Sequence, residues 1–376
     1  MKLIVRLSAL LLMLMSLSGI VQAQEHHPVT VELRSFFYGD NTEFFNPYRD
    51  GETLLGEQLR LSASMTVAKN VRIKLGAQSD GRAGGTPAFD SVVPIVSLEV
   101  GGPRNVFVMG TLRSGALDRE PAQDLWPDVS GPHGLVPPLH LDTLTMTQPN
   151  DAGLQWLHTD RALISDIWIA WRQVCTATQR EKFDVGLNSR LNILRGSHGL
   201  IGIAAQGHIL HQGGQLTHVD MVGDSDAGGF GPQGELRIGS GLLRADAFML
   251  YSKHNPDRGD LTRPDRLNGH GTFLRTAYEL RDWRGAWLVW RGTDFIQWNG
   301  DPNYGAVLND GQQPIPNVTR AARTYQEFSL SRRFRIGNDV AFMANGRYYK
   351  VDDRWDYAYR VVASIRFRRT FGGEGR

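Results

Sequence analysis

The chain has 376 residues, of which 41% are hydrophobic, and its formal net charge is +2 at pH 7. A charge this close to neutral gives no support to a nucleic-acid partner or to a strongly acidic one. The length allows one large domain or two ordinary ones, and the single cysteine, Cys175, excludes an intramolecular disulfide.

The N-terminus has the layout of a secretory signal. Two basic residues precede an apolar run over residues 7–21, and Ala23 offers a small-residue cleavage point. A membrane anchor is the alternative, but the run is short for a spanning helix of about 20 residues. We therefore predict a signal peptide over residues 1–23 and one mature domain over residues 24–376.

The mature chain alternates between apolar and polar residues. Over residues 55–67 leucine, alanine, methionine and valine fall on one parity, which Glu57 interrupts near the long-loop end, and glutamine, arginine, serine and threonine fall on the other. The pattern restarts at Val71 after a short turn and recurs over residues 182–193 and 355–369. Alternation with a period of two over such lengths predicts β-strands.

About sixteen segments of this kind follow one another along the chain. They are predicted to begin near residues 29, 54, 71, 91, 104, 152, 162, 182, 198, 233, 242, 271, 284, 323, 339 and 355. Connections after even-numbered strands are short, whereas those after odd-numbered strands are mostly long and rich in glycine, proline and aspartate. This asymmetry is typical of outer-membrane barrels.

The predicted fold is therefore all-β: a closed, antiparallel transmembrane β-barrel of about sixteen strands, within a range of roughly 14 to 18. Closure satisfies every backbone N–H and C=O group within the hydrocarbon. A soluble sandwich or propeller is disfavoured, because its strands typically have about five or six residues. Aromatic residues near the predicted connections also indicate an interface girdle. They are Trp156, Trp168, Trp171, Trp283, Trp287, Trp290, Trp298, Tyr348, Tyr349 and Trp355.

The last predicted strand supports the same class. Residues 357–367 place tyrosine, valine, alanine, isoleucine and phenylalanine on one face, and Phe371 closes the segment. This segment resembles the terminal signature of Gram-negative outer-membrane β-barrels. The resemblance implies a location in the outer membrane, contact with its lipids, and recognition of the last strand by the barrel-assembly machinery.

Basic residues outnumber acidic ones on the predicted inward parity. We expect them to line an electropositive lumen, because about sixteen strands enclose a bore too wide for wall side chains to fill. The alternative is that they form ion pairs that fill the barrel. The predicted pore-lining residues are Arg60, Arg72, Lys74, Arg190, Arg244, Arg275, Arg347, Arg360 and Arg366.

The longest connection, residues 113–151, is the third on the long-loop side, and loops of this length are usually functional. The chain is similar to general diffusion porins in strand number and mature length. In that family the third loop folds inside, and its acidic residues oppose arginines on the wall. The resemblance implies a constriction formed by Asp118, Glu120, Asp124 and Asp128. An outward-facing surface loop remains the alternative.

The sequence reveals no catalytic constellation, and we predict neither a metal nor a cofactor. His133, His198 and His270 each adjoin a glycine but fall in different predicted connections. His208, His211 and His218 lie near one another in the sequence, at the end of the ninth predicted strand. We interpret them as solvated loop residues. Asp220, Asp224 and Asp226 do not follow the order of an EF-hand loop.

These features favour a channel for passive passage of small hydrophilic, anionic solutes, set by the bore and its basic wall. A variant is export of an acidic polysaccharide along the arginines. An outer-membrane enzyme acting on lipid or glycan and an adhesion barrel without transport are the alternatives. The sequence leaves open whether three barrels associate as a homotrimer.

Overall fold

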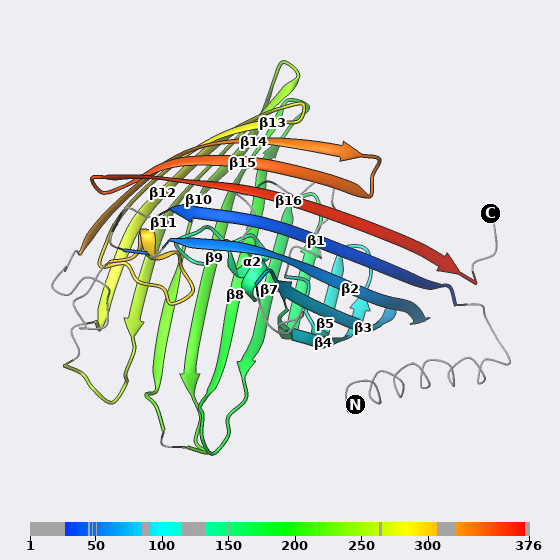
Figure 1. Cartoon of the computed structure of the whole chain (residues 1–376), viewed down its shortest axis with the longest axis horizontal. Helices are drawn as coiled ribbons and strands as arrows, with labels where there is room; N and C mark the ends of the chain where they lie inside the picture. Colours follow the sequence, from blue (N-terminus) through cyan, green and yellow to red (C-terminus); the bar gives the residue numbers. More distant parts are fainter. Residues whose placement is uncertain are drawn as a thin grey trace.

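The computed structural model describes residues 27–43, 46, 48–49, 51–84, 91–114, 126, 132–148, 150–217, 219–262, 265–306 and 321–372. These residues form a closed antiparallel barrel of sixteen strands (Figure 1). The strands are β1 (Val29–Glu43), β2 (Glu52–Ala68), β3 (Val71–Arg82), β4 (Ser91–Gly101), β5 (Asn105–Thr111), β6 (Ala152–Thr159), β7 (Leu163–Gln173), β8 (Glu181–Arg195), β9 (Gly199–Gly213), β10 (Gly223–Ile238), β11 (Gly241–Asn255), β12 (Leu267–Leu280), β13 (Trp283–Thr293), β14 (Ala322–Ile336), β15 (Val340–Val351) and β16 (Arg354–Phe371). The predicted fold class is confirmed.

The barrel closes by pairing its first and last strands. Each strand pairs with its neighbours in sequence, and β1 pairs with β16 in an antiparallel register that runs from Val29–Phe371 to Glu43–Tyr357. Figure 1 shows β1 in blue beside β16 in red. Closure leaves no unpaired edge, which a sheet in hydrocarbon requires.

The two rims differ as the sequence predicts. The turns after even-numbered strands are short, and the β2–β3 turn is made by Lys69 and Asn70, with Asn70 in the left-handed conformation (φ 64°). Asparagine tolerates this conformation, so a two-residue hairpin is favoured. The long connections all leave the opposite rim, which faces the cell exterior in this class of protein.

Within the described parts of the long connections there are three short helical segments. They are η4 (Pro132–Gly134), α2 (Leu144–Thr147) and η5 (Pro302–Tyr304). Among the described residues, no helix has the length and apolar character needed to cross a bilayer.

The two faces of β2 have the predicted chemistry. On β2, Leu55, Leu59 and Leu61 point outward and are exposed, whereas Gln58 and Arg60 on the other parity are 0% and 2% exposed. The outward leucines therefore contact acyl chains. The inward residues are shielded from bulk water rather than open to a wide bore.

Two loop segments fill the middle of the bore. Residues 132–148 and 294–306 pack against inward-facing apolar side chains of the wall and form a hydrophobic core inside the barrel. Trp290 of β13 lies in this core, with ring centroids 5.0 Å from Phe295 and 6.0 Å from Tyr304. Loop backbone and side chains thus occupy space that the wall side chains leave empty.

This core corrects part of the predicted aromatic girdle. Trp168, Trp290 and Tyr349 point inward and are buried, because they pack against the inserted loops. Trp171, Trp283, Tyr348 and Trp355 are exposed on the outer face, as a girdle requires.

Strand β10 begins ten residues before its predicted start. Residues 223–232 continue the ladder with β9 and β11, although they were expected to form a loop. The glycines in this stretch have no side chains with which to show an alternating pattern. Asp224 and Asp226, which were considered above as possible loop residues of an EF-hand, are therefore strand residues.

Candidate functional site

Residues 132–148 connect to the barrel wall through hydrogen bonds. The backbone N–H of Val136 donates to Gln206 Oε1 at 2.9 Å. On the other side, Gln58 Nε2 donates to the carbonyl oxygen of Thr145 at 2.8 Å. Gln206 lies on β9 and Gln58 on β2, so this part of the longest connection is held inside the barrel rather than over its rim.

The same connection reaches the far wall. Trp126 is buried, and the guanidinium carbons of Arg284 and Arg333 lie 5.9 and 4.5 Å from its ring centroid. These arginines belong to β13 and β14, half a circuit from β5 and β6, where the connection begins and ends. The described residues of this connection therefore contact opposite sides of the barrel wall from within the lumen.

The predicted constriction residues lie outside the described part of the chain. They are Asp118, Glu120, Asp124 and Asp128. The constriction formed by these four residues therefore stays a prediction, but a different acidic residue of the same connection, Asp142, contacts wall arginines. Asp142 Oδ2 lies 2.9 Å from Arg360 and 3.5 Å from Arg347, and Asp40 also pairs with Arg360.

This four-residue cluster fixes the charge of Asp142. Burial raises the pKa of its carboxyl group, but the charges of Arg360 and Arg347 outweigh that effect and lower the pKa to about 2. Asp142 is thus ionised across the physiological pH range, and its pairing anchors the inserted loop to β15 and β16.

A second group of predicted pore-lining residues meets in the half of the lumen near the short turns. The ion pairs run from Arg190 through Glu235, Arg244 and Glu279 to Arg284, with Arg275 paired to Asp246 at 3.0 Å. They surround a hollow of about 110 Å³. Each of these arginines thus has a carboxylate partner, while Arg190 and Arg244 keep part of their surface exposed.

The remaining predicted residues are placed around β2–β4 and β16. Arg60 donates from Nε to Gln78 Oε1 at 2.8 Å, and Arg72 pairs with Glu99. Arg366 lies 3.0 Å from Asp339, and Lys74 is half-buried on β3. All nine predicted residues lie on the polar parity, but they do not form one continuous basic surface; whether they line a conducting path stays a prediction.

His133 has a role that sequence reasoning missed. Its Nδ1 lies 2.8 Å from Asp166 Oδ2 and its Nε2 lies 3.3 Å from Asp151 Oδ2. Burial lowers the pKa of the imidazole, but the hydrogen bonds to Asp151 and Asp166 outweigh burial and raise it to about 9. The glycine beside His133 gave no sign of these partners, because both lie elsewhere in the sequence.

Arg172 extends this network to a second histidine. Its guanidinium pairs with Asp151 and, at 2.7 Å, with Asp184 Oδ2, while His208 Nε2 lies 3.0 Å from the same oxygen. The interpretation of His208 as solvated is wrong, since the residue is 0% exposed on β9. His211 also has a partner, Asp224 at 2.7 Å, whereas His218 lies outside the described residues.

The lipid-facing surface carries a hollow of about 600 Å³. Its apolar lining includes Phe37, Leu55, Phe342 and Val361, from strands β1, β2, β15 and β16. Gly39 stands between Leu55 and Val361, and its missing side chain makes the surface concave.

Two charged residues, Glu57 and Arg82, line the same hollow. Within the described part of the chain, the Glu57 carboxylate has no ionic or hydrogen-bonding partner. Towards the long-loop rim, Thr53 Oγ1 donates to Asn41 Oδ1 at 2.5 Å, and Asn41 Nδ2 donates to Glu43 Oε1 at 3.2 Å. A polar edge thus lies directly above an apolar groove.

The closed ring of sixteen strands, the apolar outer face and the long-loop rim define an outer-membrane β-barrel. The chain belongs to the Lipid A 3'-O-deacylase-type family, whose sequence profile matches residues 21–372. No curated protein matches the chain in sequence.

Solved structures of bacterial outer-membrane proteins share the fold. OmpT of Vibrio cholerae, in a form lacking loop L8, has a TM-score of 0.55 and 11% identity, over 90% of this chain and 99% of its own. OccK8 (OprE) of Pseudomonas aeruginosa has a TM-score of 0.51 and 10% identity, over 91% of this chain and 98% of its own. At such identities the similarity concerns the porin-like fold.

Proposed function

We propose that the protein hydrolyses an acyl ester of lipid A in the lipid-facing hollow between β1, β2 and β16. The family description supplies the substrate class and the reaction. The observation that carries the proposal is Glu57, an ionisable residue in an apolar, lipid-facing groove without a partner among the described residues. Such residues are costly in a membrane and usually serve a function.

The hollow suits an amphiphile whose head group lies at the outer surface. Acyl chains would pack against Phe37, Leu55 and Val361, while Asn41 and Thr53 would meet the polar head group. The ester then lies between these two regions, near Glu57.

Glu57 would act as the general base. Its carboxylate takes a proton from a water molecule as the water oxygen attacks the ester carbonyl. The carbon–oxygen ester bond then breaks, and Glu57 returns the proton to the departing alkoxide, which yields a fatty acid and a sugar hydroxyl group.

The test uses the purified chain reconstituted with lipopolysaccharide, and mass spectrometry measures both lipid A and released fatty acid. We expect the wild type to release an acyl chain and Glu57→Gln to lose at least about a hundredfold in rate. Glu181→Gln is the matched control, because Glu181 begins β8 on the far side of the barrel. An inactive wild type, or a fully active Glu57→Gln variant, contradicts the proposal.

Passage of small anionic solutes, or of an acidic polysaccharide, is the second candidate function. The arginines around the 110 Å³ hollow favour it, because Arg190 and Arg244 are partly exposed and would attract anions. Planar-bilayer recordings test it: discrete conductance steps whose anion preference falls in Arg190→Ser and Arg244→Ser support passage. An absence of conductance steps would contradict this second candidate function.

A further inference from the structure

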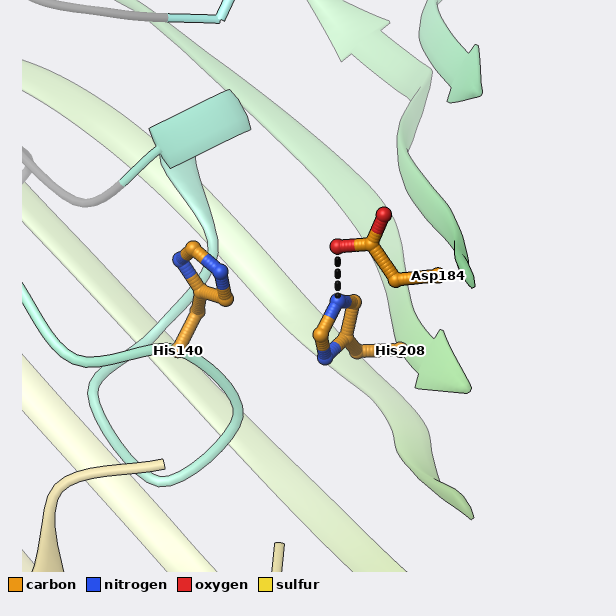
Figure 2. A group of neighbouring side chains, drawn as sticks. All are labelled: His140, Asp184 and His208. Carbon is orange, nitrogen blue, oxygen red and sulfur yellow. Dashed lines mark hydrogen bonds and ion pairs between the residues drawn. The ribbon is translucent and has the colours of Figure 1, made fainter. Parts of the chain in front are cut away.

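Three potential metal ligands meet inside the barrel. Figure 2 shows His140, from the inserted segment, facing Asp184 of β8 and His208 of β9. They are 3%, 0% and 0% exposed. The imidazole rings of His140 and His208 have centroids 5.0 Å apart and planes at 79°, an edge-to-face arrangement.

The donor atoms of the cluster are close together and incompletely satisfied. One ligand atom from each residue lies within 4.8 Å of the other two. Among the described residues, Nδ1 of His140, Nδ1 of His208 and Oδ1 of Asp184 have no hydrogen-bond partner. A buried polar atom left in this state costs roughly 1–3 kcal/mol, and a metal ion bound to Nδ1 of His140 would offset that cost.

We propose that His140, Asp184 and His208 bind a divalent transition-metal ion, for which zinc is the best match. Two imidazole nitrogens and one carboxylate oxygen form a common zinc donor set, with bonds of about 2.0–2.2 Å. Magnesium and calcium prefer oxygen ligands throughout.

The wall already has nearly the required geometry. Two donors on a tetrahedral zinc ion lie about 3.3 Å apart, given bonds of about 2.0 Å. His208 Nε2 and Asp184 Oδ2 are 3.0 Å apart. The remaining adjustment falls on His140, which belongs to a loop segment and moves more easily than a strand residue.

Arg172 serves as an outer partner of the site. Its guanidinium pairs with Asp184 and Asp151, so it orients the Asp184 carboxylate while Asp151 balances its positive charge. The metal would link the inserted segment to β8 and β9, independently of the proposed hydrolysis.

The experiment measures zinc bound to the full mature chain in detergent. After treatment with a chelator and removal of that chelator, the protein is titrated with Zn²⁺ against a chromophoric competitor, and bound zinc is counted by mass spectrometry. We expect one zinc ion per chain, a higher thermal midpoint with zinc, and, with Co²⁺ instead, the intense visible bands of a four-coordinate ion. Heat-modifiable gel migration confirms that each variant has folded.

His140→Ala and His208→Gln should each lose about tenfold or more in zinc affinity, as well as the zinc-dependent rise in thermal midpoint. His211→Gln is the matched control, because His211 lies on the same strand but pairs with Asp224 outside the cluster. The proposal is overturned if the wild type binds no stoichiometric zinc. It is equally overturned if a folded His140→Ala variant binds zinc as tightly as the wild type.

Discussion

The imidazole of His133 lies flat against the indole of Trp168, with ring centroids 3.7 Å apart and planes 3° from parallel. Asp151 and Asp166 hold the two ring nitrogens from either side. A protonated imidazole in this position gains ionic hydrogen bonds and a stacked aromatic ring together.

Stability should therefore fall as the pH rises through the pKa of His133. This pKa is raised from 6.5 to about 9, so the stabilisation is complete below about pH 6.5 and disappears as pH passes 9. His133→Gln should lower the free energy of unfolding by about 3 kcal/mol at pH 6, and this difference from the wild type should shrink towards pH 9.5. Urea unfolding in lipid vesicles at several pH values measures this difference, and a cost that does not change with pH would refute the assignment.

Gly186 provides the space for Trp168. The two residues pair directly across β7 and β8, and a methyl group on Gly186 would overlap the indole ring. Gly186→Ala should displace Trp168 from His133 and destabilise the barrel by about 1–3 kcal/mol. Gly346→Ala, at a strand position with open space, should change the thermal midpoint little. Equal midpoints for the two variants would argue against this packing.

Arg360 should matter far more than an exposed arginine. In Arg360→Met, the buried carboxylates of Asp40 and Asp142 lose a positively charged partner. Breaking a buried ion pair in this way typically lowers the free energy of unfolding by about 3–5 kcal/mol. Arg335→Gln breaks an exposed pair with Asp282 and should cost at most about 1 kcal/mol. Denaturant unfolding measures both losses of stability. Similar values for the two variants would show that the buried cluster stabilises the barrel no more than an exposed ion pair does.

Filling the outer hollow should inhibit lipid hydrolysis without loosening the barrel. Gly39 faces Leu55 and Val361 with room for a side chain, so Gly39→Leu should occupy part of the hollow. We expect roughly a tenfold or greater loss of fatty-acid release with an unchanged thermal midpoint. Gly346→Leu is the control on the outer face of β15, and full activity in Gly39→Leu would place the substrate elsewhere.

Most of the barrel was predictable because alternation is a local signal. The predicted starts at residues 29, 71, 91 and 152 coincide with those of β1, β3, β4 and β6. The prediction was wrong where side chains carry no pattern. Residues 223–232 of β10 are rich in glycine, and backbone hydrogen bonds to β9 and β11, rather than alternating side chains, make them a strand.

The interior was less predictable, because its partners are distant in sequence. His140 and His208 lie 68 positions apart by their numbering, and the chain folds back through the lumen before they meet. Neither residue stands in a motif with metal-ligand spacing. The inward orientation of Trp168 and Trp290 was hidden for the same reason, since a tryptophan near a strand end suits a membrane interface equally well.

The fifteen paired positions between β1 and β16 make the pairing of the first and last strands as continuous as that of neighbouring strands elsewhere in the barrel. Val29 and Phe371 consequently stand side by side, so a short linker would join them without disturbing the wall. A circular permutant opened between Gly239 and Ser240, in a tight turn, should then close into the same cylinder with β11 as its opening strand.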